Sequence, residues 1–365
     1  MDNKHEYLDR RALEYCNLNV NLYFACLWPA ADDERLREQA LHILGEECGQ
    51  IIHERDVNLG YNGLFNFMVQ IYEHQGWTGT YENRHMGVRV KVDKCHLEGK
   101  PTHAVIFECC SLERVAMAKE KIRKLFSMGN DAIHISDNDK ETRLMAELLL
   151  NPNSRHHLRY GNPDSCTNFN QLFNEYRDRL KNYEHQDAYI IDSSSVLAVY
   201  GLRDCRDLDF LTTDPEWEQV LRECREIDNH ASQLRYYQIS LNDMLNNPQN
   251  YFVYRGVKFV SLNALKAMKQ CRGEEKDKYD VKIIERFEKK GKVFAKPVPR
   301  KRERKKIRGR DILLWLKYKR KEIIEKILKY NVPGKILLKL MKPVARITHK
   351  EDKWSNYFAF WEKQR

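Results

Sequence analysis

Residues 188–214 read AYIIDSSSVLAVYGLRDCRDLDFLTTD, and the fold of the surrounding chain is best predicted from this stretch. Residues 188–192 have the apolar character of a short buried strand, and the serines at 193–195 form a polar turn that opens a helix. Gly201 is placed to end that helix, and residues 207–212 have the pattern of a second strand. The stretch therefore predicts a strand, a turn, a helix and another strand in close succession.

The second of these strands carries two carboxylates on one face. Because side chains alternate along a strand, Asp207 and Asp209 point to one side, while Leu208 and Phe210 point toward a core. Two such carboxylates repel each other unless a cation lies between them, and hard divalent ions take oxygen ligands of this kind. The serine turn offers hydroxyls and N–H groups that suit a phosphate. Alone, Asp-Leu-Asp is equally typical of a solvated strand end.

This arrangement resembles the nucleotidyltransferase-fold (polymerase-β-like) superfamily, in which a strand, a Gly-Ser turn and helix, and a strand bearing Asp-x-Asp hold metal and nucleoside triphosphate. Ser195 stands twelve positions before Asp207, a spacing found in that family. Residues 256–284, GVKFVSLNALKAMKQCRGEEKDKYDVKII, look like the strand, helix and Arg-x-x-x-Lys-Asp-x-x-Asp element of small bacterial nucleotidyltransferases. The resemblance covers residues 186–290. One departure is the Ser-Ser-Ser turn, which lacks the glycine that permits close backbone approach to a phosphate.

The resemblance implies roles for particular residues. Asp207 and Asp209 would bind Mg²⁺ or Mn²⁺, and the fold usually supplies a third carboxylate from a later strand. Asp228 is the first candidate for that carboxylate and Asp243 the second. The residues expected to bind the nucleoside triphosphate are Ser193, Ser194, Ser195, Arg203, Arg272 and Lys276.

The sequence after Arg272 also has a simpler interpretation. Arg272, Lys276 and Asp280 are spaced four apart and would share one face of a helix, as in an ordinary salt-bridged surface stripe. By resemblance, Asp277 would fix this helix to the catalytic sheet. His230 and Arg235 are close enough to Asp228 in sequence to line the cleft, although both are equally typical of surface residues.

Length and composition restrict the class of protein. The chain has 365 residues, which exceeds the usual size of a domain with a single hydrophobic core. Because 42% of the residues are hydrophobic, we expect a globular protein, with two domains and an appendage. No run of about eighteen apolar residues and no apolar signal-peptide core are present, so we expect a cytoplasmic protein. The ten cysteines include no Cys-x-x-Cys pair, which predicts reduced thiols rather than a zinc site.

The positive charge is concentrated near the C-terminus. Residues 296–346 contain 19 Lys and Arg against 4 Asp and Glu, a net charge of +15, which leaves 10 − 15 = −5 for the rest. Segments 311–330 and 335–347 are amphipathic, with an apolar stripe of Leu and Ile. The stripe favours an anionic membrane surface as the partner over nucleic acid, for which stacking aromatics without an apolar stripe would be expected.

These features predict an α/β (α+β) protein in four parts. An N-terminal α/β domain of alternating units, with strands at 88–92 and elsewhere, occupies residues 1–150, and a linker rich in Asn, Pro, Gly and Ser follows at 151–170. A nucleotidyltransferase-like mixed-sheet domain spans 171–290, and a basic amphipathic helical tail spans 291–365. The sequence indicates no role for the first domain.

Three functions are consistent with these features of the sequence. The first is a metal-dependent nucleotidyl or phosphoryl transferase that uses a nucleoside triphosphate at the cytoplasmic membrane face, as a peripheral protein of polysaccharide or lipid-linked glycan assembly. The second is an RNA-modifying nucleotidyltransferase with a basic RNA-binding tail. The third is a non-catalytic, nucleotide-binding scaffold.

Overall fold

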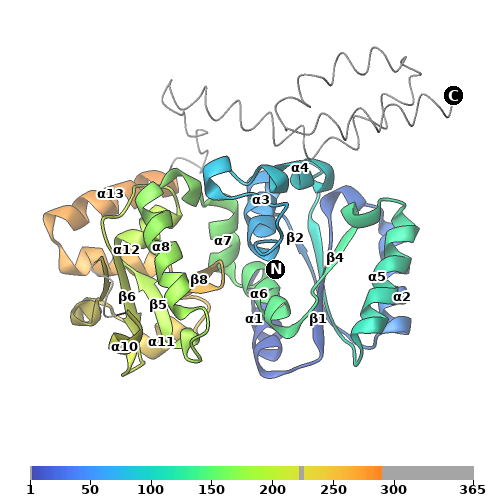
Figure 1. The fold of residues 1–365 in the computed structure, drawn as a ribbon, viewed down its shortest axis with the longest axis horizontal. Coiled ribbons are helices and arrows are strands. Elements are labelled where there is room, and N and C mark those ends of the chain that lie inside the picture. The colour runs from blue at the N-terminus through green and yellow to red at the C-terminus, as the bar shows by residue number, and fades with distance from the viewer. Residues whose placement is uncertain (1, 222–225, 290–365) are drawn as a thin grey trace, which may run out of the picture. The chain divides into compact units, whose positions relative to one another are not determined.

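The chain is a mixed α/β protein with two sheets, which confirms the predicted class (Figure 1). The computed structural model describes residues 2–221 and 226–289, which belong to one compact unit. The basic tail predicted over 291–365 lies outside the described residues. Among the described residues, no helix has the length and apolar character needed to cross a membrane.

The first sheet has four strands, and each neighbouring pair is antiparallel. In spatial order they are β2 (Ile51–Val57), β3 (Thr102–Glu108), β1 (Leu22–Leu27) and β4 (Ile133–Ile135). Side chains of β1 alternate between two cores: Phe24 and Cys26 enter one, and Ala25 and Leu27 enter the other. The sheet is therefore covered on both faces.

Helices from different parts of the sequence cover these faces. One face packs against α2 (Glu34–Glu47) and α5 (Leu112–Phe126), which lie together beside the sheet in Figure 1. The helices of the other face are α1 (Asp2–Leu18), α3 (Gly60–Ile71), α4 (Met86–Cys95) and α6 (Asp139–Leu150).

The strand predicted at 88–92 is wrong, because these residues belong to helix α4. Val88 and Val92 are fully buried and lie four residues apart, which puts both on one face of a helix. Gly87 allows the helix to approach the chain closely, since a Cβ there would lie 1.7 Å from the carbonyl oxygen of Trp77. This close packing overrides the β-propensity of the valines.

The segment expected to be a linker, residues 151–170, differs from that expectation. It contains α7 (Pro152–Tyr160) and the start of α8 (Thr167–Leu180). The buried side chain of Asn151 accepts hydrogen bonds from the backbone N–H groups of Asn153 and Ser154, and Pro152 occupies the first helical position. The Asn and Pro residues that resemble a loop in the sequence are thus a helix start.

The second sheet has five strands of mixed direction. In spatial order they are β7 (Ile227–Asn229), β6 (Leu208–Thr212), β5 (Tyr189–Asp192), β9 (Val257–Val260) and β8 (Tyr251–Tyr254). β7 runs parallel to β6 and β5 parallel to β9, whereas β5–β6 and β8–β9 are antiparallel. The associated helices are α9 (Ser194–Val199), α10 (Trp217–Leu221), α11 (Leu241–Asn246), α12 (Leu262–Arg272) and α13 (Glu275–Lys289).

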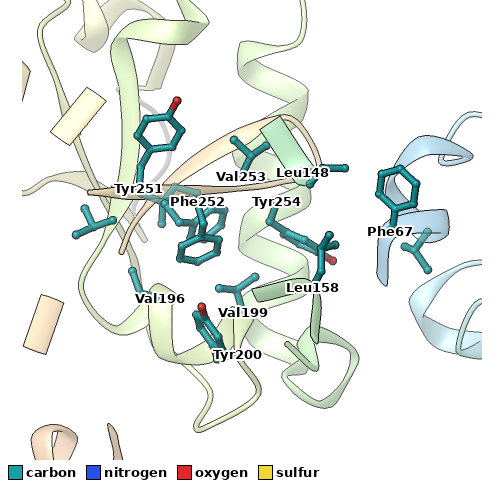
Figure 2. Close-up of a cluster of buried hydrophobic side chains, with 14 of the residues drawn as sticks. Phe67, Leu148, Leu158, Val196, Val199, Tyr200, Tyr251, Phe252, Val253 and Tyr254 are labelled. Atoms are coloured by element: carbon teal, nitrogen blue, oxygen red, sulfur yellow. The ribbon is translucent and has the colours of Figure 1, made fainter. Parts of the chain in front are cut away.

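One hydrophobic core extends through the surroundings of both sheets. Figure 2 shows side chains of this cluster from the N-terminal half, which contains the first sheet, and from the C-terminal half, which contains the second. They include Phe67 of α3, Leu158 of α7 and Phe252 of β8. The cysteines that the structure describes are all free and most are buried, as expected for reduced thiols. The two sheets therefore share this core, and a second, smaller core lies on the α2 and α5 face of the first sheet.

Candidate functional site

Three aspartates lie next to one another on adjacent strands of the second sheet. Asp192 at the end of β5 is the register partner of Asp209 in β6, and Asp209 is in turn the partner of Asp228 in β7. Register partners on neighbouring strands project from the same face of a sheet. Asp228, the first candidate for a third carboxylate, is therefore beside Asp209, whereas Asp243 lies in α11 and accepts a hydrogen bond from Ser240 at 2.7 Å.

The predicted pair, Asp207 and Asp209, differs in environment. Asp207 is exposed just before β6, and Asp209 is partly buried. Burial raises the pKa of Asp209, and the charges of Asp207 and Asp192 raise it further, while His230 and a hydrogen bond from Ser193 act in the opposite direction. Burial is the largest of these effects, and the neighbouring carboxylates add to it.

Asp192 was not predicted as a site residue, although it is the most buried carboxylate of the site. It accepts hydrogen bonds from the backbone N–H of Ser193 at 2.5 Å, from Nδ1 of His230 at 3.1 Å and from the hydroxyl of Tyr237. Burial lowers the pKa of His230, but the hydrogen bond and charge of Asp192 outweigh it and raise the pKa overall. His230, named from sequence as a neighbour of Asp228, is thus held by Asp192 instead.

The serine turn takes a backbone conformation that glycine usually adopts. Ser193 has φ of 59° and ψ of −133°, and the side chains of Ser193, Ser194 and Ser195 are buried. Holding a residue with a Cβ in this conformation costs on the order of 1–3 kcal/mol. The hydroxyl of Ser195 donates to the carbonyl oxygen of Asp207 at 3.4 Å, which joins the turn to the second strand.

The two predicted arginines already have carboxylate partners. Arg203 donates from Nε and Nη2 to Asp280 at 2.7 and 2.8 Å. Arg272 donates to Asp277 at 2.8 and 2.7 Å and from Nη1 to the side-chain oxygen of Gln233 at 3.1 Å. Each guanidinium is thus fixed in position with most of its donors engaged, and the charge of Asp192 acts on Arg272.

The predicted single helical face from Arg272 to Asp280 is not present. Gly273, with φ of 71°, ends α12, so that Arg272 lies on α12 and Lys276 on α13. Lys276 is exposed and pairs with Glu274 at 3.1 Å.

Lys269, which was not predicted as a site residue, is the lysine that pairs with the buried aspartates of α13. Lys269 is 2% exposed and lies 3.2 Å from Asp277 and 2.9 Å from Asp280. Asp277 and Asp280 therefore bind α13 to α12 and, through Arg203, to the loop before β6. The sequence signal for Lys269 was its position three residues before Arg272 on an apolar helix, which suggests a buried face.

The donor set of the site fits a hard divalent cation. Within residues 2–221 and 226–289, no three His, Cys, Asp or Glu side chains are arranged to hold a metal ion. Mg²⁺, however, is usually bound by one or two carboxylates together with water and substrate phosphates. Because Asp192 is occupied by protein partners, Asp207 and Asp209 are the carboxylates that would hold such an ion.

Comparison of the chain with protein-family models, with curated proteins and with solved structures finds no match. Function must therefore be inferred from the chemistry of these side chains.

Proposed function

We propose that the chain is a metal-dependent nucleotidyl or phosphoryl transferase that uses a nucleoside triphosphate. The observation that carries this proposal is the register of Asp192, Asp209 and Asp228 across β5, β6 and β7, directly beside the serine turn. This constellation combines paired carboxylates for Mg²⁺ or Mn²⁺ with hydroxyls for phosphate.

In the proposed reaction, an acceptor hydroxyl attacks the α-phosphorus of the nucleotide and pyrophosphate leaves. The metal ion, when bound, supplies charge neutralisation at the phosphates. Ser193 and Ser194 orient the phosphates, Ser195 joins the turn to the second strand, and the exposed carboxylate of Asp228 takes the proton of the acceptor hydroxyl. Arg272, which Asp277 fixes in position, interacts with the charge of Asp192 and contributes positive charge to this site, whereas Arg203 is held by Asp280.

Asp192 has a positioning role in this proposal. Its carboxylate accepts the N–H of Ser193, so that the turn keeps its left-handed conformation, and it also holds His230 and Tyr237. A buried carboxylate with three hydrogen-bond donors is satisfied by the protein and does not need a metal ion.

We further propose that the acceptor lies at the cytoplasmic face of a membrane, in polysaccharide or lipid-linked glycan assembly. The support is the net charge of +15 in residues 296–346 together with the apolar stripe of that tail. An RNA acceptor is the second candidate, because the same cations would also bind phosphates of RNA.

The test is incubation of the purified protein with each labelled nucleoside triphosphate and Mg²⁺, followed by measurement of pyrophosphate or another phosphate product. Asp209→Asn should abolish product formation and weaken binding of metal and nucleotide in calorimetry. Asp178→Asn is the matched control, since Asp178 is an exposed carboxylate on α8. Equal activity of Asp209→Asn and the wild type would place the site elsewhere, and nucleotide binding without any product would favour a scaffold.

A further inference from the structure

A polar pocket lies at a different place from the aspartates. Its volume is about 270 Å³, and it is lined by the end of α3 and the loop after it, by α8 and by the turn between β8 and β9. That turn, at Arg255, precedes β9, which runs parallel to β5 with Lys258 opposite Ile190. Asp192 ends β5, so the turn and the aspartates lie at opposite edges of the sheet, roughly 13 Å apart along the strands.

The strongest charges of the pocket are paired within the protein. Glu73 receives hydrogen bonds from Arg177 at 2.5 and 3.0 Å and from Nε of Arg255 at 2.9 Å. Burial acts to raise the pKa of Glu73, but Arg255 and Arg177 outweigh it and lower the pKa, so the carboxylate remains charged and matched. His85 is likewise near Asp164, at 3.5 Å. Glu73 offsets one of its two arginines, and the carboxylate of Glu82, which also lines the pocket, offsets the other in the sum, so a charged ligand would meet no excess of either sign.

Neutral hydrogen-bonding groups remain available to a ligand. Asn170 is 1% exposed and donates its amide N–H groups to the carbonyl oxygens of Pro163 and Cys166 at 2.8 and 2.6 Å, which leaves its Oδ1 as an acceptor. Asn174 accepts from Arg255 at 3.2 Å through Oδ1, which leaves its amide donors. The pocket thus offers fixed donors and acceptors from uncharged amides.

Three residues around the pocket adopt left-handed backbone conformations although none of them is glycine. Arg84, His85 and Arg255 have φ of 57°, 48° and 50°. Such conformations each cost on the order of 1–3 kcal/mol and are enriched at sites that hold ligands. His85 and Arg255 both line the pocket, so this cost is concentrated there.

We propose that this pocket binds one neutral, polyhydroxylated ring, such as a single neutral sugar unit. Each hydroxyl of such a ring both donates and accepts, which matches Asn170 and Asn174, and the ring brings no charge to disturb the Glu73 pairs. The volume is close to the lower end of the roughly 300–1,000 Å³ of small-molecule pockets, which favours one ring over a larger ligand. This binding does not depend on the proposed transfer reaction.

The test is equilibrium binding to the full chain without nucleotide or metal. Neutral hexoses and an N-acetylhexosamine are compared with a uronic acid, an amino sugar and inorganic phosphate, by calorimetry or ligand-observed NMR. We expect saturable binding of at least one neutral sugar and at least tenfold weaker binding by Asn174→Ala. Asn130→Ala, an exposed asparagine distant in sequence from the pocket lining, should bind as the wild type does.

Three results would overturn the assignment: no saturable binding of any neutral sugar, tighter binding of the uronic acid, amino sugar or phosphate, or unchanged affinity in Asn174→Ala. Hydrogen exchange adds a measurement that does not depend on a variant, because sugar should protect the backbone of residues 78–85. Repeating the titration with Asp209→Asn separates the two proposals, since sugar binding should persist in that variant whether or not the transferase activity exists.

Discussion

Ser193 combines a strained backbone with a contact to a proposed catalytic carboxylate. Its φ of 59° and ψ of −133° suit glycine, so Ser193→Gly should relieve strain that Ser193→Ala keeps. Both variants lose the hydroxyl that bonds Asp209. The difference between their free energies of unfolding therefore measures the backbone strain alone. We expect the Gly variant to be more stable than the Ala variant by about 1 kcal/mol in urea unfolding. Equal stabilities would contradict the left-handed turn.

His157 should make the fold sensitive to acid. Burial lowers its pKa to about 3, and its ring stacks on Phe252 while Nε2 bonds the carbonyl oxygen of Val199 at 3.2 Å. An unfolded histidine takes up a proton below its usual pKa of about 6.5, whereas the folded one does not until about pH 3. Above about pH 6.5, His157 therefore has no effect on how the free energy of unfolding varies with pH. Between about pH 6.5 and pH 3, it lowers the free energy of unfolding by at most about 1.4 kcal/mol for each unit that the pH falls.

The measurement for His157 is the free energy of unfolding at several pH values between 7 and 4, compared with His157→Phe. The wild type should lose stability more steeply with falling pH than the variant, because other titrating groups contribute equally to both. Parallel curves would show that His157 accepts a proton in the folded state.

Local periodicity in the sequence predicted strand β6, although the strand begins at Leu208 and leaves Asp207 just outside it. Asp228, expected from a later strand, lies in β7 as the register partner of Asp209, and the catalytic roles of these aspartates stay predictions. Asp192 was missed because its partners, His230 and Tyr237, lie 38 and 45 residues away in the chain. Nothing in a single sequence specifies such a long-range contact.

At the scale of elements, a buried ion network connects α12 and α13. Lys269→Met would leave Asp277 and Asp280 each with one cation fewer in the interior, and we expect a loss of stability of about 3 kcal/mol. Lys276→Met is the control, since its side chain is 68% exposed and should change stability by less than about 0.5 kcal/mol. Thermal unfolding of the two variants measures the difference, and equal effects would mean that Lys269 is dispensable to the network.

At residues 88–92 and 151–160 the sequence pattern predicted a different structure from the one observed. The apolar alternation at 88–92 indicates a strand, yet the approach of Gly87 to Trp77 requires a helix there. The Asn and Pro residues at 151–160 are typical of loops, yet Asn151 is buried and caps α7. Gly87 contacts Trp77, and the amide of Asn151 donates to the carbonyl oxygen of Tyr251 at 3.2 Å, and composition alone does not report such contacts.

At the scale of the whole molecule, the basic C-terminal segment predicts binding to anionic lipid. Each Lys or Arg near such a surface contributes on the order of 1 kcal/mol at low salt. Neutralising three tail lysines should therefore weaken binding of the full chain to anionic liposomes by roughly 100-fold. The tail variant changes Lys301, Lys305 and Lys306 to Gln, and the control changes Lys124, Lys140 and Lys181, which are exposed in the described part of the chain.

Liposome sedimentation with neutral and with anionic lipid compares these two variants. Equal affinities, or no binding by the wild type, would remove the membrane from the proposed function. Retained RNA binding in place of lipid binding would then favour the second candidate acceptor.

The hydrophobic core that continues through the surroundings of both sheets has a consequence for how ligands are detected. Because Phe67 and Phe252 belong to one cluster, the two halves should melt together, and a ligand held by either half should stabilise both. At a concentration 100 times its dissociation constant, a ligand adds about 2.7 kcal/mol. Intrinsic fluorescence of buried Trp28 and of Trp217, which packs on Phe210, should then follow the shared melting transition, so screening for the nucleotide needs no label at the site itself.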